Sequence, residues 1–444
     1  MKFAAVVATA LLTACASVPR DAGVAEVEQA LAARGVERVV WAAQPNASDD
    51  PQSLALLRDG ELTAEKAVAI AMRNSPRLQV TLAELGIARV ALLQESTIPN
   101  PLLEVEYRIP ADPFHAYELR LAQSLVDLLR LGSRRAIARI GFDAASMRIT
   151  AAVLRIAAEV RESYYDLLAA SQQVAQNRVA LESAKAAAEL AVRQHDAGNI
   201  TDLDLENEQA SYEQAKLGLA RAERDLLVAR EALVRNMGLR DNSIEWQLPQ
   251  DFPPLPASEP EPSQLEELAA AQRLDIAIVR REIDAAGRQL PLARLAALGE
   301  LVGDIHYQRD AEGPRTWGPG LEFPLPLFNR GTAARNRVEA EWLRSKHMLN
   351  ALLAESSSSL RAARASLIEA RARVEYYRNV VVPRRERIVH LTTLEHNAML
   401  VGTFQLLQSK QSEAEARRGL IEAQRDYWRA RIGLDRALHG IGDR

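Results

Sequence analysis

The residue types that most often carry out chemistry are few in this chain and form no recognisable constellation. A single cysteine and seven histidines occur among its 444 residues. A zinc site needs several nitrogen and sulfur ligands at short spacing, and the histidines do not pair at such spacing with carboxylates. We therefore predict no metal site and no cofactor, and we expect a protein that is not an enzyme.

The one cysteine stands where its thiol could be modified. In residues 1–14, Lys2 is followed by an apolar run, which is typical of a signal peptide and too short to span a bilayer. The run ends in Leu12-Thr13-Ala14-Cys15, which resembles the lipobox of bacterial lipoproteins, whose cysteine is lipidated and becomes the mature N-terminus. We expect Cys15 to be a lipid attachment site. The alternative is an ordinary signal peptide with an incidental cysteine.

A second group of polar residues lies at a predicted turn between two long helices. Residues 134–194 hold no proline and one glycine, and they are dominated by strong helix formers. About sixty residues at about 1.5 Å each give a rod on the order of 90 Å, which must pack against similar rods. The turn His195-Asp196-Ala197-Gly198-Asn199-Ile200-Thr201 supplies residues that tolerate left-handed angles, and Thr201 or Asp202 can cap a return helix over residues 203–236.

The return helix occurs twice in the sequence. A shift of the chain against itself by 201 residues pairs His195 with His396 and Leu205 with Leu406, and the dipeptide Arg224-Asp225 with Arg425-Asp426. About a dozen identities in one register over roughly forty residues indicate a duplicated helical hairpin. The second rod is expected over residues 332–395.

Four segments alternate apolar and polar residues with period two: 103–109, 117–123, 299–309 and 316–325. That pattern predicts strands with one face in an apolar medium, and each is about long enough to cross a bilayer when tilted. A half-buried hairpin in a water-soluble protein would show the same pattern. Pro319 marks the last segment as irregular or as an edge strand.

We therefore divide the chain into five parts. After the leader (residues 1–14) and a lead-in (residues 15–60), residues 61–240 form a first repeat. Residues 241–262 are a proline-rich linker, in which a continuous helix is excluded, and residues 263–444 form a second repeat. Each repeat is predicted to run helix, strand, strand, long helix, turn, helix.

This order resembles the TolC family of outer membrane efflux proteins over nearly the whole chain. Three features carry the resemblance: the stretch from Leu62-Thr63 to Asn74-Ser75-Pro76, the two junctions between strand hairpin and rod, and the duplicated return helix. The stretch Asn397-Ala398-Met399-Leu400-Val401-Gly402-Thr403-Phe404-Gln405-Leu406-Leu407-Gln408 is similar to the CzcC-like, cation-efflux branch.

The resemblance implies a mostly α fold with a small transmembrane β part. Three protomers would each give four strands to one twelve-stranded barrel, and their helical hairpins would form an α-barrel tunnel through the periplasm. Physical constraints agree, because four strands cannot close a barrel and open edges are not tolerated in lipid. An eight-stranded barrel is filled by its own side chains, whereas twelve strands leave a passage.

In such a trimer the two kinds of turn would ring one periplasmic aperture. Gly198 and Gly402 are expected to let the chain reverse there by adopting left-handed backbone angles. Acidic residues after the first turn would favour cations at the aperture; alternatively, they are helix-N-terminal carboxylates that suit the helix dipole. The candidate tip and aperture residues are His195, Asp196, Gly198, Asp202, Asp204, Glu206, Glu395, Asn397, Gly402, Thr403, Gln405 and Gln408.

The expected function is that of the outer membrane channel of a tripartite efflux system in a Gram-negative bacterium, exporting metal cations or drugs. Its partners would be a periplasmic adaptor and an inner-membrane pump, with the proton-driven RND type favoured, and outer membrane lipid. The formal net charge of −4 argues against a nucleic-acid partner. The alternative is a periplasmic coiled-coil adaptor or scaffold lipoprotein, which would also carry long helical hairpins.

Overall fold

The computed structural model describes residues 23–36, 39–41, 50–108, 116–240, 246–295, 299–309, 314–325, 327–328 and 330–442. The leader and Cys15 therefore lie outside the described residues. The chain divides into two compact units, each built from three segments. The first consists of Met1–Val27, Leu82–Thr150 and Leu274–Ala354, and the second of Glu28–Thr81, Ala151–Arg273 and Glu355–Arg444.

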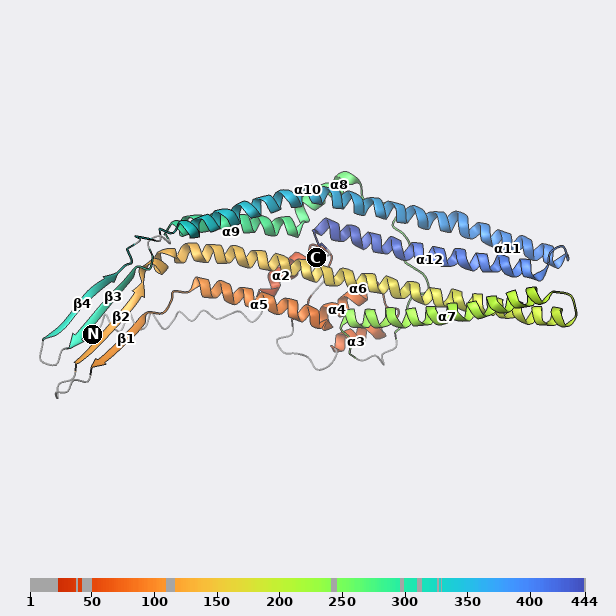
Figure 1. Ribbon diagram of the computed structural model, residues 1–444, viewed down its shortest axis with the longest axis horizontal. Coiled ribbons are helices and arrows are strands. Elements are labelled where there is room, and N and C mark those ends of the chain that lie inside the picture. Colours follow the sequence, from red (N-terminus) through yellow and green to blue (C-terminus); the bar gives the residue numbers. More distant parts are fainter. Residues whose placement is uncertain are drawn as a thin grey trace. The chain divides into compact units, whose positions relative to one another are not determined.

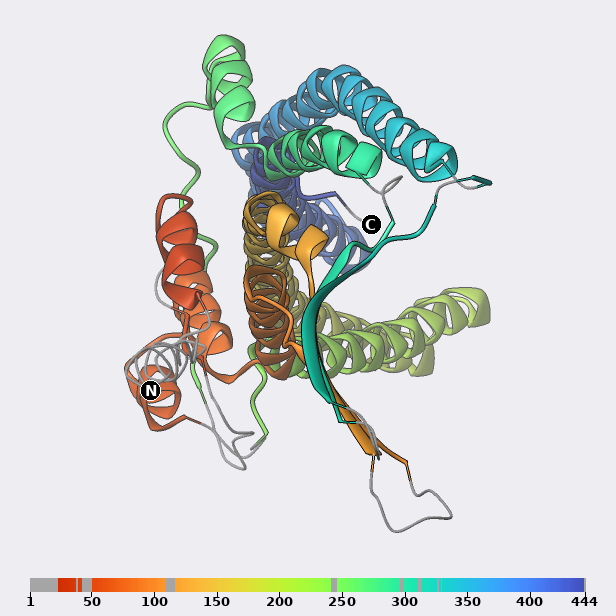
Figure 2. The same cartoon turned by 90° about the vertical axis from the view of Figure 1, so that its left-hand side faces the viewer.

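The first unit contains one antiparallel sheet in the order β1-β2-β3-β4 (Figures 1 and 2). Its strands are β1 (Leu102–Arg108), β2 (Ala116–Ser124), β3 (Val302–Arg309) and β4 (Arg315–Glu322), so all four predicted strands are confirmed to within a few residues. Pro319 lies in β4 opposite Ile305. β4 is an edge strand of the protomer's sheet, and edge strands are where proline is usually found.

The first half of the chain contains α2 (Val24–Ala32), α3 (Pro51–Arg58), α4 (Ala64–Asn74), α5 (Pro76–Ser96), α6 (Leu125–Asp196) and α7 (Asp202–Met237). Thr63 caps α4 by accepting from the Lys66 N–H, and Pro76 separates α4 from α5 as its missing N–H requires. The rod α6 begins at Leu125, earlier than the predicted residue 134. Ser124 makes this early start possible, since its hydroxyl accepts from the Asp127 N–H at 3.2 Å.

The second half contains α8 (Pro262–Gln272), α9 (Leu274–Leu295), α10 (Thr332–Tyr376), α11 (Val382–Asn397) and α12 (Thr403–His439). The predicted second rod over residues 332–395 is confirmed, since the chain is helical from Thr332 to Asn397, but it contains a π-helical turn, η2 (Tyr377–Val381), between α10 and α11. Pro383 follows directly. Proline cannot donate to the carbonyl four residues earlier and its ring clashes with it, so the helix opens by one residue at this point.

The end of α7 abuts the junction between α4 and α5. Gly238 terminates α7 with a φ of +75°, and its backbone lies so close to Ser75 that an added Cβ would stand 2.6 Å from the Ser75 Cα. The end of α12 meets the α8–α9 junction in a similar way, since the Arg273 guanidinium donates to the Ala437 carbonyl at 3.2 Å. Each return helix therefore ends against the shorter helices of its own repeat.

Gly238→Ala is expected to destabilise this unit by about 1–3 kcal/mol, because the methyl group would collide with rigid backbone. Gly433→Ala is the matched control. Gly433 lies inside α12 with nothing within 4 Å of its Cβ position, so alanine should stabilise by up to about 1 kcal/mol. Thermal unfolding of the detergent-solubilised variants measures both, and equal melting temperatures would contradict the packing at Gly238.

Candidate functional site

The first turn is held by its own hydrogen bonds. Gly198 has a φ of +74°, as predicted, and Thr201 is the residue that caps α7. The Thr201 hydroxyl accepts from the Asp204 N–H at 3.2 Å, and the Asp204 carboxylate accepts from the Thr201 N–H at 3.1 Å. This reciprocal capping box satisfies two backbone donors that the helix cannot pair by itself. The pKa of the Asp204 carboxyl is lowered. The main cause is the hydrogen bond from the Thr201 hydroxyl, and the hydrogen bond from the Thr201 N–H is the second.

The remaining polar residues of the first turn stay near the surface. His195 Nε2 lies 2.7 Å from the Asp202 carboxylate, and its Nδ1 lies 3.9 Å from Asp196. The Asp202 side chain is nevertheless 95% exposed, and Glu206 is exposed as well. The capping interpretation thus accounts for Asp204 through direct contacts, while Asp202 and Glu206 present negative charge to solvent.

The second turn differs from the expectation. Gly402 has a φ of −74° and acts as the N-cap of α12, so it does not supply the left-handed residue and the prediction for it is wrong. The left-handed residue is Met399, with a φ of +59°. The shift of 201 residues carries this signal, because it aligns Gly198 with Met399 and Thr201 with Gly402.

The surface of the second turn is more apolar than that of the first. Met399 is 93% exposed and Leu400 is 76% exposed. The His396 ring holds the turn from inside, with Nδ1 3.2 Å from the Val401 carbonyl. The other predicted residues sit on either side: Glu395 and Asn397 end α11, Thr403 begins α12, and Gln405 and Gln408 lie exposed on its first turns.

The sheet places most of its apolar side chains on one face and most of its charged side chains on the other, although Arg309 and Arg315 share the apolar face at one end of the strands. Register places Val105, Leu119, Tyr307 and Trp317 in one row across the four strands, and Val105, Leu119 and Trp317 are exposed. The neighbouring row, on the opposite face, is Glu104, Arg120, His306 and Gly318.

One arginine connects all four strands on the polar face. Arg120 lies 2.7 Å from Glu322, 3.2 Å from Asp304 and 3.7 Å from Glu104. Gly320 leaves room for this arrangement, since a Cβ there would stand 2.5 Å from the Asp304 carboxylate. Sequence reasoning missed this ionic hub because alternation identifies the polar face without indicating which side chains meet across strands.

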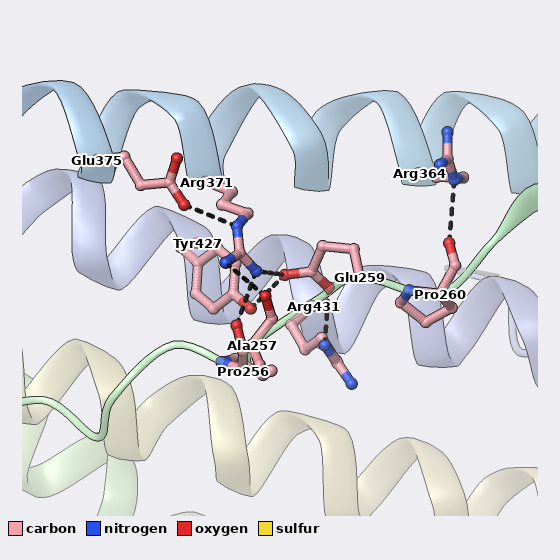
Figure 3. A network of polar contacts seen from close by, with 9 residues as sticks. All are labelled: Pro256, Ala257, Glu259, Pro260, Arg364, Arg371, Glu375, Tyr427 and Arg431. Carbon is pink, nitrogen blue, oxygen red and sulfur yellow. Dashed lines mark hydrogen bonds and ion pairs between the residues drawn. The ribbon is translucent and has the colours of Figure 1, made fainter.

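A second ionic cluster was also missed, in the linker. The Glu259 side chain is only 8% exposed. It accepts from Arg371 of α10 at 3.0 Å, and from the Tyr427 hydroxyl at 2.7 Å and Arg431 at 2.8 Å, both on α12 (Figure 3). We call these four residues the Glu259 clasp. Burial, and then the hydrogen bond to Glu259, raises the pKa of Tyr427 to about 12.

The clasp is reinforced by backbone contacts and an aromatic cluster. Arg371 also donates to the Pro256 carbonyl at 2.9 Å, and Arg364 donates to the Pro260 carbonyl at 3.3 Å (Figure 3). Beside it, the Tyr165 ring stacks on the rings of Trp428 and of Phe252 in the linker, with 5.0 Å and 6.3 Å between the ring centroids. The linker is therefore packed against helices of both repeats.

The described part of the chain offers no cluster of metal ligands. Within those ranges, no group of three or more histidine, cysteine or acidic side chains is placed to hold a metal ion. Among the helices that the structure describes, none is long and apolar enough to cross a membrane.

Comparisons with known proteins agree with this architecture. The chain is 25% identical over 392 residues to the cobalt-zinc-cadmium resistance protein CzcC of Cupriavidus metallidurans, covering 85% of this chain and 90% of that protein. Its fold matches a membrane protein from Pseudomonas aeruginosa, with a TM-score of 0.73 and 21% identity over 92% of this chain and 98% of that one. It also matches the outer membrane channel CmeC of Campylobacter jejuni, with a TM-score of 0.68 and 18% identity over 91% and 95% of the two chains.

The fold is thus that of TolC-like α-barrel channels. Residues 114–239 match the model of the outer membrane efflux protein family. The chain therefore carries an outer membrane efflux family domain and is a homologue of CzcC.

The two glycines of the turns should respond differently to the same substitution. Gly198→Thr places a β-branched residue at a left-handed φ, which costs about 1–2 kcal/mol and should loosen the first turn. Gly402→Thr meets no such strain and adds a hydroxyl at the N-cap, as Thr201 has in the first turn, which should tighten α12. Hydrogen exchange of the two turns measures the effect, and faster exchange at both would contradict the difference in backbone angle between Gly198 and Gly402.

Proposed function

We propose that this outer membrane efflux protein is the channel of a tripartite efflux system for divalent metal cations, and that three copies form it. The main support for the proposal comes from the sheet of the first unit. Its apolar row is exposed, and its two edge strands, β1 and β4, each pair with only one other strand in the described part of the protomer. A sheet of this kind needs hydrocarbon on its apolar face and further strands at its edges.

The trimer follows from closing the sheet. β1 of one protomer would pair with β4 of the next, and three sheets of four strands would make a barrel wide enough for a passage. The charged row with Arg120 would then face the aqueous interior. A periplasmic adaptor or scaffold, the alternative function, has no use for an exposed apolar strand face.

Metal cations are favoured as substrates by two observations. The curated relative is named for cobalt, zinc and cadmium resistance and aligns over most of both chains. In addition, Asp202 and Glu206 expose carboxylates beside the first turn, and negative charge at an aperture raises the local concentration of cations. A water-filled tunnel leaves the choice among metals to the pump.

The two turns are the proposed docking surface for a periplasmic adaptor, which would connect the channel to a proton-driven inner-membrane pump. Met399 and Leu400 support this role, because two almost fully exposed apolar side chains on a defined turn are suited to fill a partner's pocket. The backbone strain at Met399 supports it further, since a glycine there would relieve that strain and the chain keeps a long apolar residue instead.

Deletion of the gene should lower the tolerance of the host to cobalt, zinc or cadmium, and the wild-type gene should restore it. Met399→Asn should fail to restore tolerance while the trimer level stays normal, because asparagine keeps the left-handed turn and removes the apolar side chain. Met399→Leu is the matched control and should restore it. Unchanged metal tolerance after deletion would contradict the substrate assignment, and full rescue by Met399→Asn would contradict the docking role.

We also propose that Cys15 is lipidated and anchors the protein to the outer membrane. The support is the position of Leu12-Thr13-Ala14-Cys15 after an apolar run. Mass spectrometry of the mature N-terminus should find a diacylglyceryl-modified cysteine, and Cys15→Ala should remove the modification. A mature chain that begins elsewhere, without lipid, would contradict this proposal.

A further inference from the structure

The apolar face of the sheet ends in a row that contains two arginines. The register aligns four residues across β1, β2, β3 and β4, namely Tyr107, Tyr117, Arg309 and Arg315. This row lies two positions along each strand from the apolar row that contains Leu119. Side chains two positions apart on a strand point to the same face, so both arginines project from the apolar face. We call these four residues the rim row.

The rim row lies at the end of the sheet that is away from the rods. α6 begins at Leu125, directly after β2, and α10 follows β4, so both rods leave the sheet from its other end (Figure 1). Gly303 marks that other end, since an added Cβ there would stand 3.3 Å from the Leu125 side chain. Arg309 follows six positions later in β3, which is about 20 Å along an extended strand. A band of apolar side chains therefore separates the rim row from the rods.

The two arginines of the rim row lie directly opposite each other on neighbouring strands. Both are exposed. Like charges in directly opposite positions of an antiparallel pair destabilise the sheet, because their Cβ atoms are only about 5 Å apart. In the described part of the chain, neither Arg309 nor Arg315 forms an ion pair with a carboxylate. An anion from outside the protomer would remove this repulsion.

The opposite face of the same sheet shows how an arginine is neutralised when the chain supplies the anions. Arg120 lies within 3.7 Å of three carboxylates, those of Glu322, Asp304 and Glu104. Among the described residues, the apolar face holds no comparable group of carboxylates around the rim row. The charge of the rim row is therefore available to a ligand that approaches the apolar face.

Aromatic side chains surround the two arginines. The Tyr117 hydroxyl accepts a hydrogen bond from Arg309 and shares one with Tyr307, and the centroids of the two tyrosine rings are 5.9 Å apart. Tyr107 is 54% exposed and Trp317 is 77% exposed. Tyrosine and tryptophan gather where a transmembrane strand passes from hydrocarbon into the headgroup layer. The rim row thus combines two guanidinium groups with side chains suited to that layer.

The position of the rim row identifies the anion that could reach it. With the rods in the periplasm, the end of the sheet away from them lies in the outer leaflet of the outer membrane. That leaflet consists of lipopolysaccharide, whose lipid A part carries phosphates on a disaccharide with several acyl chains. Arginine binds phosphate oxygens through two parallel hydrogen bonds. The acyl chains would lie along the apolar band, and the tyrosine hydroxyls would face the sugar.

We propose that the rim row is a binding site for the phosphorylated headgroup of lipid A on the lipid-facing surface of the sheet. The bound phosphates neutralise Arg309 and Arg315 and so remove the repulsion between β3 and β4 at this end. Each protomer carries one such site. This inference rests on the proposed function, since it requires the sheet to lie in the outer membrane with the rods toward the periplasm.

Native mass spectrometry of the full-length, detergent-extracted protein, titrated with bisphosphorylated lipid A, tests the site. We expect one lipid A per protomer, bound at least about tenfold more tightly than lipid A stripped of its phosphates, because the arginines recognise the phosphates. Arg309→Gln with Arg315→Gln should remove this preference, whereas Arg309→Lys with Arg315→Lys, which keeps both charges, should retain most of it. Arg384→Gln with Arg385→Gln, two exposed arginines of α11, is the matched control and should bind lipid A as the wild type does.

The outcomes separate the lipid site from the proposed function. Equal affinity of the wild type for phosphorylated and phosphate-free lipid A would overturn the site, because the acyl chains alone would then account for binding. Full binding by the double glutamine variant would overturn it as well. If that variant failed to assemble, the comparison of the two lipids on the wild type and on the lysine variant would still decide. Normal phosphate-dependent binding in a protein whose deletion leaves metal tolerance unchanged would refute the metal assignment and leave the lipid site standing.

Discussion

A sheet of four antiparallel strands leaves two edges whose backbone N–H and C=O groups need further partners. In water these edges would be solvated, but the hydrocarbon that we propose for the exposed apolar row through Leu119 and Trp317 offers no hydrogen bonds. The two requirements are compatible only if the edges pair with other strands. One protomer does not supply those strands, since the described chain places all four of its strands in this one sheet. The assembly of several copies that we propose would supply them.

Duplication explains the repeated order of helices and strands, and divergence between the two repeats explains how their turns and rods differ. The two turns share one backbone design, with a left-handed residue at Gly198 and Met399 and a cap at Thr201 and Gly402. The chemistry differs: the first turn is closed by a charged capping box, and the second exposes apolar side chains. The rods diverge in the same way, because α6 is continuous and the second rod contains a π turn. The first repeat thus combines a charged turn with a continuous rod, and the second combines an apolar turn with a rod that contains a π turn.

The sequence predicted what local rules determine. Period-two alternation located the strands, Thr63 and Thr201 located helix starts, and Pro76 located a break, because each of these acts on its own neighbours. The left-handed residue was misassigned because glycine preference is a local rule, whereas Met399 is held at its angle by the hydrogen bonds that close the turn after α11. Alignment of the two repeats contained the correct answer, since it pairs Met399 with Gly198.

Local rules could not predict contacts between distant segments. The Arg120 hub joins residues up to 202 positions apart, and the Glu259 clasp joins a proline-rich linker to residues more than 110 positions later. A buried carboxylate is costly unless paired, so the three donors around Glu259 became evident only once the fold was known.

The sheet, on this account, completes a barrel in the outer membrane only when several copies combine. Single-particle electron microscopy of the full-length protein in lipid nanodiscs tests this claim most directly. We expect three protomers around one axis, β1 of each hydrogen-bonded to β4 of the next, with Leu119 and Trp317 facing lipid and Arg120 facing the interior. A monomer whose sheet lies outside the lipid, or an assembly with Arg120 against the acyl chains, would contradict it.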